Sequence, residues 1–234
     1  MSERHTKSAL IELINVSKVY GINHRSTTAI NNVSFQAFPG ELILLLGPSG
    51  SGKTTLLTLI AGLLQPTTGI IRLFNKSVEC YDKTSLQLIR ASKIGFVFQT
   101  FQLIDALTAE ENIMLGLQFA GNKRKKSKRK VQEIFDLLNI SHLAYKLPTE
   151  MSHGEKQRVA IARAITNNPD LIIADEPTAN LESSQGFEII RLLREYASKN
   201  DTCVIVASHD LRLTEYADCT LYLKDGKVEN KVYN

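Results

Sequence analysis

Residues 47–54 read GPSGSGKT, and this stretch decides the fold of the 234-residue chain. It matches the pattern G-x-x-x-x-G-K-[ST] without substitution, after the apolar run 42–46 and before the helix-like run 56–64. A polyphosphate needs many hydrogen-bond donors and little side-chain bulk, and glycines that expose successive backbone N–H groups supply both. The alternative is a glycine-rich turn between a strand and a helix, which the complete motif in this context disfavours.

The side chains of this loop predict a nucleoside triphosphate site that uses Mg²⁺. The ammonium of Lys53 would bridge the β- and γ-phosphates, and the hydroxyl of Thr54 would be a ligand of the metal ion. The residues expected to contact the nucleotide here are Gly47, Pro48, Ser49, Gly50, Ser51, Gly52, Lys53, Thr54 and Thr55.

Two adjacent carboxylates end a second apolar run at residues 171–176, LIIADE. Because neighbouring side chains of a strand point to opposite faces, Asp175 and Glu176 are expected to have different roles. Asp175 would hold the metal through its water shell, while Glu176 would polarise the water that attacks the γ-phosphate. The alternative interpretation is a helix cap. With the phosphate loop present, the pair favours a nucleotide hydrolase.

The order of patterns along the chain predicts an α/β fold. Residues 10–16 and 29–35 alternate in the manner of strands, with turn residues between them, which predicts an antiparallel layer. The apolar runs 42–46, 171–174 and 204–207 are continuous, as in a parallel sheet that is buried on both faces. Between residues 108 and 164 the apolar spacing is mostly helical. We therefore expect one domain with a helical lobe in the middle of the chain.

Composition favours a cytoplasmic chain with a buried core. Hydrophobic residues make up 43% of the sequence, yet the longest unbroken aliphatic run is 42–46. A membrane span needs roughly 18 to 20 apolar residues. The first residues lack the apolar stretch and cleavage site of a secretory signal. Three cysteines without C-x-x-C spacing suit a reducing compartment and predict neither a disulfide framework nor a metal site.

The net charge of +4 comes from one short run. Seven of the eight residues 123–130 are basic, and without them 21 basic residues face 24 acidic ones. A solvated charged loop is the first interpretation, contact with anionic lipid the second, and nucleic acid the third. The run has no interleaved aromatic residues for base stacking, so no specific nucleic-acid partner is expected.

Residues 151–164, MSHGEKQRVAIARA, resemble the signature segment that defines the ABC ATPases. The resemblance covers about residues 10–228 and implies a P-loop NTPase fold with a RecA-like parallel core. Residues of about 10–40 and 69–75 would form an antiparallel β-subdomain, and 41–98 with 161–228 the nucleotide-binding core. Residues of about 99–160 would form an inserted helical subdomain that carries the signature.

Three single residues look like further motifs of the same family. Tyr20 resembles the aromatic residue that stacks on adenine, Gln99 the glutamine of the Q-loop, and His209 the switch histidine that contacts the γ-phosphate. Each also has a structural interpretation, as strand surface, loop residue and capped turn respectively. Their joint order along the chain favours the functional interpretation. The resemblance thus assigns catalysis to Glu176, His209, Gln99 and Lys53, and metal binding to Thr54, Gln99 and Asp175.

The signature segment is expected to act on the nucleotide of a second copy of the chain. The family implies that the Ser152 hydroxyl and the Gly154 backbone N–H contact the γ-phosphate of the opposite subunit, with Glu155 in the same nucleotide-binding group. His153 replaces the first of two usual glycines. Because histidine suits a left-handed backbone poorly, we expect an ordinary helical conformation there. Glu182 stands where the interface loop 180–182 usually has aspartate.

The resemblance also implies a mechanism and its partners. ATP would hold two chains in a head-to-tail homodimer, and hydrolysis would let them separate. The moving halves would act on a separate membrane permease that docks near Gln99 to Leu103, on the cytoplasmic face of the inner (plasma) membrane. The alternative is that the apolar residues of this segment pack under the helical lobe.

Residues 95–99, GFVFQ, and 107–113, LTAEENI, most resemble the ATPases of lipoprotein-releasing, macrolide-efflux and cell-division permease systems. An export or envelope-directed role is therefore expected. A nutrient importer is the alternative, since its motifs are the same. A non-transport ABC protein acting on DNA or ribosomes is disfavoured, because the chain has one cassette and no long coiled-coil insertion. Cargo is not indicated, since its recognition resides in the permease.

Overall fold

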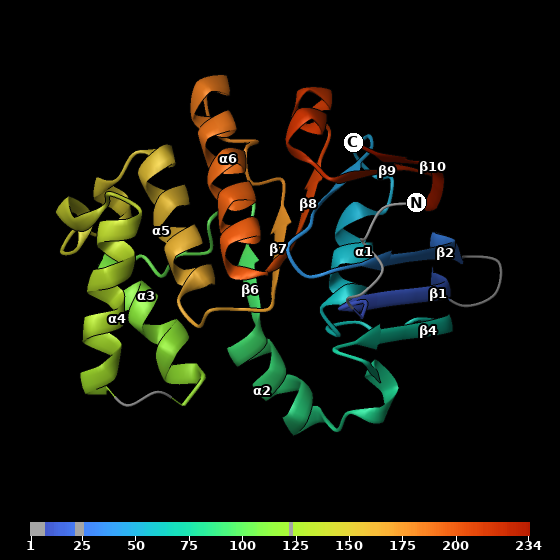
Figure 1. Cartoon of the computed structure of the whole chain (residues 1–234), viewed down its shortest axis with the longest axis horizontal. Helices are drawn as coiled ribbons and strands as arrows, with labels where there is room; N and C mark the ends of the chain where they lie inside the picture. Colours follow the sequence, from blue (N-terminus) through green and yellow to red (C-terminus); the bar gives the residue numbers. More distant parts are fainter. Residues whose placement is uncertain (1–7, 22–25, 122–123) are drawn as a thin grey trace.

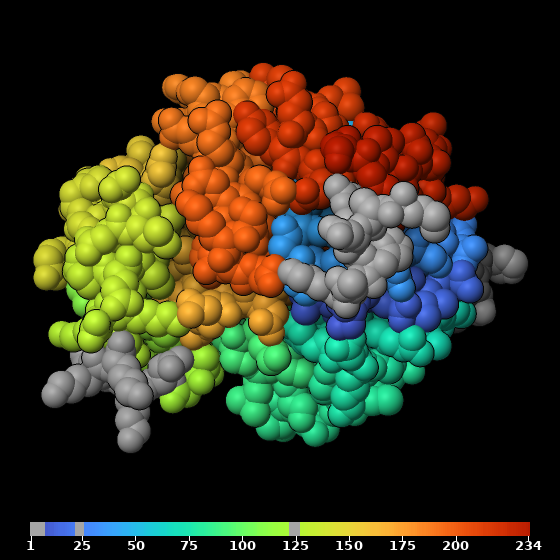
Figure 2. Space-filling model, in the orientation of Figure 1, coloured from blue at the N-terminus to red at the C-terminus, as the bar shows by residue number. Residues whose placement is uncertain are grey.

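The computed structural model describes residues 8–21, 26–121 and 124–234, with the backbone alone described at 124–126. Figure 1 shows a helical lobe at one end of the long axis, a central sheet with helices against it, and a small antiparallel sheet towards the other end. The space-filling view of Figure 2 places the same two end regions far apart on this face. The expected α/β architecture of a P-loop NTPase is confirmed.

The central sheet runs in the order β10, β9, β3, β8, β7, β6. The strands are β3 (Leu42–Leu46), β6 (Ile94–Val97), β7 (Leu171–Asp175), β8 (Cys203–Ser208), β9 (Cys219–Lys224) and β10 (Lys227–Tyr233). Neighbouring strands are parallel except β9 and β10, which form an antiparallel hairpin. The continuous apolar runs of the sequence are therefore the parallel strands that were predicted.

Strand β3 is buried on both faces, as its sequence predicts. Leu42, Leu44 and Leu46 belong to one hydrophobic core, which extends into the helical lobe. Ile43 and Leu45 belong to the other, which joins the central sheet to the antiparallel sheet. Because successive side chains of a strand point to opposite faces, one strand anchors both cores.

The antiparallel sheet runs in the order β2, β1, β4, β5. Its strands are β1 (Ile11–Tyr20), β2 (Thr27–Ala37), β4 (Thr68–Leu73) and β5 (Lys76–Ser77). The buried side chains of β1, β2 and β4 pack towards the central sheet, and they include Ile11, Leu13, Ile30, Val33 and Ile71. This sheet forms one wall beside the phosphate loop.

The helices divide between the core and the lobe. Helices α1 (Lys53–Ile60), α2 (Lys83–Lys93) and α6 (Ser183–Asn200) accompany the central sheet, and α3 (Ala109–Phe119), α4 (Arg124–Leu137) and α5 (His153–Ile165) form the lobe. Short 3₁₀ segments lie at Val78–Cys80, Ser141–Leu143, Pro148–Glu150 and Leu211–Tyr216. No helix within the described ranges combines the length and the apolar character of a membrane span.

The expectation of a solvated loop for the basic run is wrong, because residues 124–130 form the first half of helix α4. Lysine and arginine are good helix formers, and the helix gains stability by burying Val131, Ile134 and Phe135 on one face, which Ser127 shares. Lys128 and Arg129 are exposed. Lys123 lies outside the described residues.

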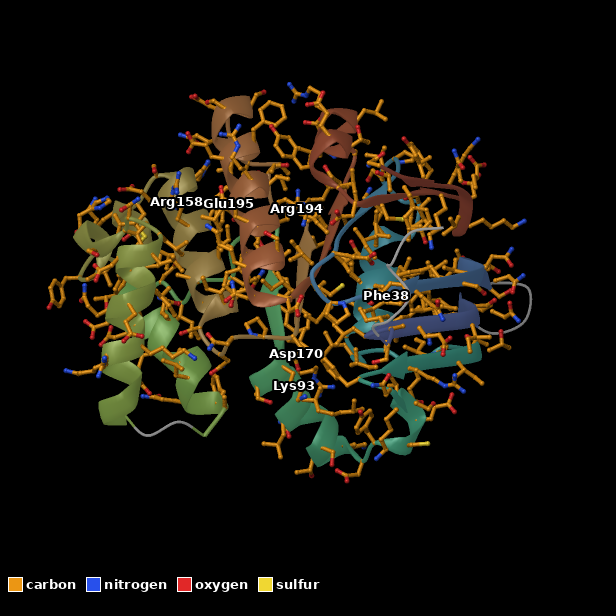
Figure 3. The ribbon with its side chains drawn as sticks, viewed as in Figure 1. Phe38, Lys93, Arg158, Asp170, Arg194 and Glu195 are labelled. Atoms are coloured by element: carbon orange, nitrogen blue, oxygen red, sulfur yellow. The ribbon has the colours of Figure 1, made fainter. Side chains whose placement is uncertain are left out.

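Two ion pairs link neighbouring parts of the fold, in addition to the two hydrophobic cores. Arg158 of α5 pairs with Glu188 of α6 at 2.7 Å, which links the lobe to the core. Arg194 of α6 pairs with Asp218 at 2.8 Å, and Asp218 also accepts a hydrogen bond from the backbone N–H of Leu42. Arg158 and Arg194 lie along neighbouring helices in Figure 3. These partly exposed pairs add little stability compared with the two cores.

Candidate functional site

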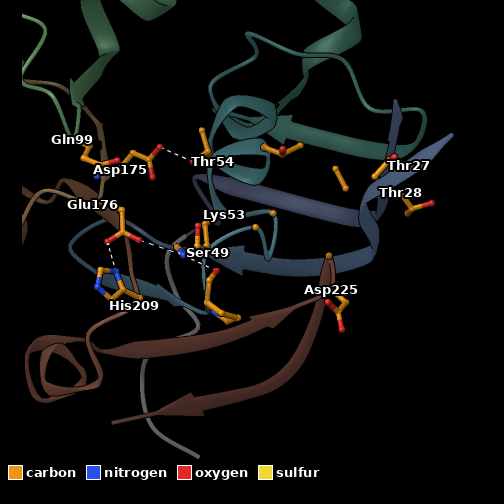
Figure 4. A pocket seen from close by; sticks show the side chains of 16 residues that line it. Thr27, Thr28, Ser49, Lys53, Thr54, Gln99, Asp175, Glu176, His209 and Asp225 are labelled. Carbon is orange, nitrogen blue, oxygen red and sulfur yellow. Dashed lines mark hydrogen bonds and ion pairs between the residues drawn. The ribbon is translucent and has the colours of Figure 1, made fainter. Parts of the chain in front are cut away.

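A pocket lies over the phosphate loop (Figure 4). It is lined by the loop itself, by β2, by residues at or just after the ends of β6, β7 and β8, and by the turn between β9 and β10. Its wall towards β2 carries Thr27, Thr28 and Ala29, and its opposite wall carries the acids that end β7. The lining residues are Thr27, Thr28, Ala29, Pro48, Ser49, Gly50, Gly52, Lys53, Thr54, Thr55, Gln99, Asp175, Glu176, His209, Asp225 and Gly226. The predicted phosphate loop, carboxylates, glutamine and histidine therefore meet in one place.

The shape of the phosphate loop depends on contacts with two distant segments, the turn between β9 and β10 and the strand β2. The N–H of Gly226, in the turn between β9 and β10, donates to the Ser51 carbonyl at 3.0 Å, and its own carbonyl accepts from Asn31 of β2 at 2.8 Å. A Cβ on Gly52 or on Gly226 would stand 2.5 or 2.6 Å from the Ala29 carbonyl oxygen. Both glycines have positive φ, so only glycine permits this approach of three backbone segments.

Lys53 is the buried cation of the site and the first residue of α1. Its ammonium donates to the carbonyls of Gly47 at 2.7 Å and Pro48 at 3.1 Å, and it lies 3.3 Å from Glu176 Oε1. These contacts satisfy the charge of a side chain that is only 7% exposed. The incoming phosphate oxygens of a nucleotide would compete with the same three partners for the ammonium.

Asp175 and Thr54 form the part of the site that fits a divalent cation. The Thr54 hydroxyl donates to Asp175 Oδ2 at 2.8 Å, while Asp175 Oδ1 is buried and has no hydrogen-bond partner among the described residues. Burial raises the pKa of the Asp175 carboxyl, and the neighbouring Glu176 charge raises it further. Hydroxyl and carboxylate oxygens are the ligands that Mg²⁺ prefers, so the residues present suit that ion.

The expectation that Asp175 and Glu176 point to opposite faces is wrong, because both side chains line the pocket. Strand β7 ends at Asp175, and Glu176 has φ 47°, in the left-handed region. Its N–H still bonds the Ala207 carbonyl at 3.0 Å, so the turn is anchored to β8. The strand rule fails where the strand stops. A left-handed residue other than glycine costs about 1 kcal/mol and is often found at functional sites.

Glu176 lies between two groups that carry or can carry positive charge. Its Oε2 is 3.0 Å from His209 Nδ1, while its Oε1 faces the Lys53 ammonium. The Glu176 side chain is 14% exposed, and the imidazole of His209 is 65% exposed. The carboxylate is therefore oriented from both sides, at the end of the pocket opposite Asp225 (Figure 4).

Gln99 lines the same pocket and is tied to the segment that follows Glu176. Its backbone carbonyl accepts a hydrogen bond from Asn180 Nδ2 at 2.8 Å. Glu182, the unusual acid of that segment, stands at the N-cap of α6 and makes no side-chain capping bond. The loop between β7 and α6 thus positions Gln99 through Asn180.

The signature residues do not line this pocket. Ser152 caps α5 by accepting from the Glu155 N–H at 3.2 Å, and Glu155 accepts from the Ser152 N–H at 2.7 Å. This backbone bond lowers the pKa of Glu155, and Lys146, 3.3 Å away, lowers it further. Gly154 lies in the same first turn. The start of this helix is thus separate from the pocket, and its first N–H groups with the positive end of the helix dipole are of the kind that favours an anion.

His153 begins α5 with a φ outside the left-handed region, so its expected helical backbone is confirmed. The position does not require glycine. Its ring lies against the ring of Phe101, with centroids 5.8 Å apart. No local sequence pattern predicts this contact, because the two residues are far apart along the chain.

Tyr20 is the last residue of strand β1 and is 43% exposed. It does not line the pocket, but its partner in the β1–β2 register, Thr27, does. The ammonium of Lys18 is 5.4 Å from the centroid of its ring. Residues 22–25, which follow Tyr20, lie outside the described residues.

Several lining residues were not predicted. Thr27, Thr28 and Ala29 carry no motif, and they reach the pocket only because β2 passes beside Gly52. The Asp225-Gly226 pair is a recognisable hairpin turn between two strands. No local pattern, however, predicts that this hairpin lies against the phosphate loop.

In the segment 99–103, Gln99, Thr100 and Gln102 are exposed, while the apolar residues Phe101 and Leu103 are half-buried. Leu103 packs against the core of the helical lobe, and Arg163 Nη2 donates to the Phe101 carbonyl at 2.8 Å. The structural alternative therefore fits these apolar side chains better. An exposed apolar groove lies next to them instead, between α2, the edge strand β6 and the end of α3. Its lining is Leu63, Thr84, Gln87, Leu88, Arg90, Ala91, Phe96, Phe98 and Phe119.

Comparison with known proteins places these features in a family. The model of the ABC transporter family matches residues 30–179. An uncharacterized ABC transporter ATP-binding protein of Thermotoga maritima is 39% identical over 94% of each chain. A putative hemin import ATP-binding protein, HrtA, of Staphylococcus haemolyticus is 40% identical over 94% of this chain and 99% of its own.

Solved structures resemble the whole chain. A dimeric structure of the ABC transporter cassette MJ0796, a protein of Methanocaldococcus jannaschii, has a TM-score of 0.87 and 38% identity, and covers 95% of this chain and 98% of its own. A post-hydrolysis dimer of the same cassette with ADP and Pi has a TM-score of 0.87 and 37% identity over the same shares of the two chains.

The helical backbone at His153 predicts that its ring is not needed for chemistry. His153→Gly should leave the rate of ATP hydrolysis at saturating ATP and protein within a few-fold of the unaltered chain, because Ser152 and Gly154, the residues expected to contact the nucleotide, are unchanged. Steady-state phosphate release measures this. A loss of about a hundredfold, roughly 2.7 kcal/mol of transition-state stabilisation, would place His153 among the catalytic residues.

Proposed function

This chain belongs to the ABC transporter ATP-binding family and is an ATPase, and from that premise we propose that two copies close around two ATP molecules to drive a separate membrane permease. The observation that carries the proposal is the division of the site. The pocket holds the phosphate loop, the two acids and His209, while Ser152 lies outside it on the other lobe. Each half-site needs a second chain to complete it.

The pocket supports hydrolysis of the terminal phosphate. Backbone N–H groups of residues 49–54 and the Lys53 ammonium would bind the phosphates, and Thr54 with Asp175 would hold Mg²⁺. When bound, that ion would withdraw charge from the phosphate oxygens. Phosphate binding would draw Lys53 away from Glu176. The Glu176 carboxylate could then accept a proton from a water as that water attacks the γ-phosphorus, and the bond from phosphorus to the ADP oxygen would break.

His209 and Gln99 would position this reaction. The His209 ring holds Glu176 from the side opposite Lys53, so the carboxylate keeps its direction after Lys53 turns to the phosphates. Gln99 enters the pocket from the segment that joins core and lobe. Both residues would thus report the presence of the γ-phosphate to neighbouring segments.

The second chain would contribute the start of its helix α5. The Ser152 hydroxyl and the N–H of Gly154 would contact the γ-phosphate, where the positive end of the helix favours negative charge. The MJ0796 dimer with ADP and Pi supports this arrangement for the present chain. Glu182 would lie near the interface between the two chains.

The permease would dock in the apolar groove beside Gln99. Leu88 is 58% exposed there and Phe119 is 73% exposed, beside the stacked rings of Phe96 and Phe98. An amphipathic helix of the permease could bury these side chains. Because Phe98 directly precedes Gln99, docking would act on the catalytic pocket through one short segment. Attachment of this kind would hold the chain on the cytoplasmic face of the membrane.

We favour an export or envelope-directed role on the resemblance of residues 95–99 and 107–113 to such systems. Import is the second candidate, supported by the HrtA relative, whose name assigns it to hemin import. Identifying the permease beside which this chain works would decide between them.

Glu176→Gln should bind ATP with nearly unchanged affinity and hydrolyse it very slowly, because the amide cannot accept the proton of the attacking water. Binding of a fluorescent ATP analogue and single-turnover phosphate release measure the two properties. Hydrolysis at the unaltered rate would remove Glu176 from the role of base and make His209 the next candidate.

In the Glu176→Gln background, ATP should convert the chain to a dimer in sedimentation velocity, and Ser152→Arg should abolish that dimer. The arginine would crowd the start of α5 where the opposite nucleotide must approach. Without ATP, both variants should sediment as monomers. A chain that stays monomeric while hydrolysing ATP fully would contradict the two-chain site.

Leu88→Glu together with Phe119→Glu should release the chain from the membrane fraction of its own host cells, because two charges would enter the apolar groove. ATP hydrolysis by the purified variant should stay within about twofold, as exposed sites seldom affect folding. Leu137→Glu with Tyr145→Glu is the matched control, since both residues are exposed on the lobe outside the groove. Equal membrane retention of the two double variants would contradict docking in the groove.

A further inference from the structure

The segment between the catalytic pocket and the helical lobe has an unusual backbone. Phe101 and Gln102 are consecutive residues with φ of 60° and 52°, both in the left-handed region. Residues with a Cβ adopt this region at a cost, so contacts from the surroundings must hold the turn. The segment also starts at Gln99, which lines the nucleotide pocket.

Helix α5 supplies those contacts. The guanidinium of Arg163, in the last turn of the helix, donates to the carbonyls of both Phe101 and Gln102. At the first turn, the His153 ring lies against the Phe101 ring, with centroids 5.8 Å apart and planes tilted by 34°. This separation is within the range of attractive aromatic pairs.

The two contacts are widely spaced along the helix. His153 and Arg163 are ten residues apart, which is about 15 Å along an α-helix. Between them, buried Val159, Ile161 and Ala162 pack into the core of the lobe. The segment 101–102 is thus attached to α5 at two points, one in the first turn of the helix and one in the last.

The first turn is where the signature residues lie. Ser152 directly precedes His153 and caps the helix through the Glu155 N–H. A glycine at position 153, as in the signature that the segment resembles, would keep this cap but would have no ring to place on Phe101. The histidine therefore adds a second attachment beside the cap.

We propose that His153 is a positioning residue of the two-chain ATP site: its ring, seated on Phe101, fixes the start of α5 and sets the approach of Ser152 to the nucleotide of the opposite chain. The inference rests on the proposed function, because Ser152 acts only in the dimer. His153 itself takes no part in the chemistry. Its effect is on how readily the dimer forms.

The test measures the concentration dependence of the ATP-bound dimer of Glu176→Gln by sedimentation velocity, with His153→Gly, His153→Phe, Phe101→Leu and the double variant His153→Gly/Phe101→Leu. We expect His153→Gly to raise the dimer dissociation constant about tenfold, since both chains lose the contact that holds the start of α5 in its binding-competent position. His153→Phe should stay within about twofold, because a ring is retained. The double variant should be no weaker than His153→Gly alone.

Other outcomes separate the explanations. If the increases in the dimer dissociation constant caused by His153→Gly and by Phe101→Leu multiply in the double variant, the two rings act independently and the proposed contact is overturned. An unchanged dissociation constant in His153→Gly would overturn it as well. A His153→Phe variant as weak as His153→Gly would show that the imidazole acts as a polar group instead. His153 is exposed, so its variants are expected to fold. If Phe101→Leu does not fold, the two His153 variants decide the question.

Two controls complete the design. Tyr145→Gly, which removes an 85% exposed ring from the same lobe, should leave the dimer unchanged. If the Glu176→Gln parent does not dimerise with ATP at all, the proposed function fails. If the parent dimerises and the ring variants have no effect, only the role of His153 fails.

Discussion

The burial of strand β3 on both faces is the constraint on which the rest of the structure depends. Its alternate residues anchor two separate cores, one shared with the helical lobe and the other with the antiparallel sheet. The phosphate loop leaves the end of this strand, so its first residue, Gly47, is held as firmly as the strand is. Neighbouring parallel strands end at the same edge, which brings Asp175 and Ser208 level with the loop. A flexible loop on a mobile strand could not align so many backbone donors with one phosphate.

Within this frame, the central electrostatic feature is one carboxylate shared by two potential cations. Glu176 contacts Lys53 with one oxygen and His209 with the other. Its left-handed backbone makes the arrangement possible by turning the side chain into the pocket. The same Lys53 is the group that a γ-phosphate would attract. Nucleotide binding would therefore be linked to the orientation of the Glu176 carboxylate through a single ammonium, because Glu176 would lose one of its two contacts when that ammonium turned to a phosphate.

Those residues show why sequence alone predicted the central site but not its surroundings. The phosphate loop is a local pattern that needs its own backbone, so residues 47–54 could be identified directly. The strand rule failed at Glu176, because it assumes a strand that continues past Asp175. The contacts of Thr27, Asp225 and Phe101 join segments that are distant along the chain, and only tertiary packing brings them together. The basic run was misinterpreted for another reason: its backbone extends the helix of Val131 and Phe135 towards the N-terminus, and Ser127 continues the buried face of that helix.

The attachments of the segment 99–102 connect the nucleotide pocket with the helical lobe. Its first residue is bonded to Asn180 of the core, while its third and fourth are bonded to α5 of the lobe. A movement of the lobe relative to the core would therefore act on the backbone near Thr100, because the residues on either side of it are attached to different parts. The apolar groove borders the same segment through Phe98. A partner bound in the groove would contact this segment through Phe98, and a nucleotide in the pocket would contact it through Gln99. Each would then alter the position of Ser152, since coupling between two ligands acts in both directions.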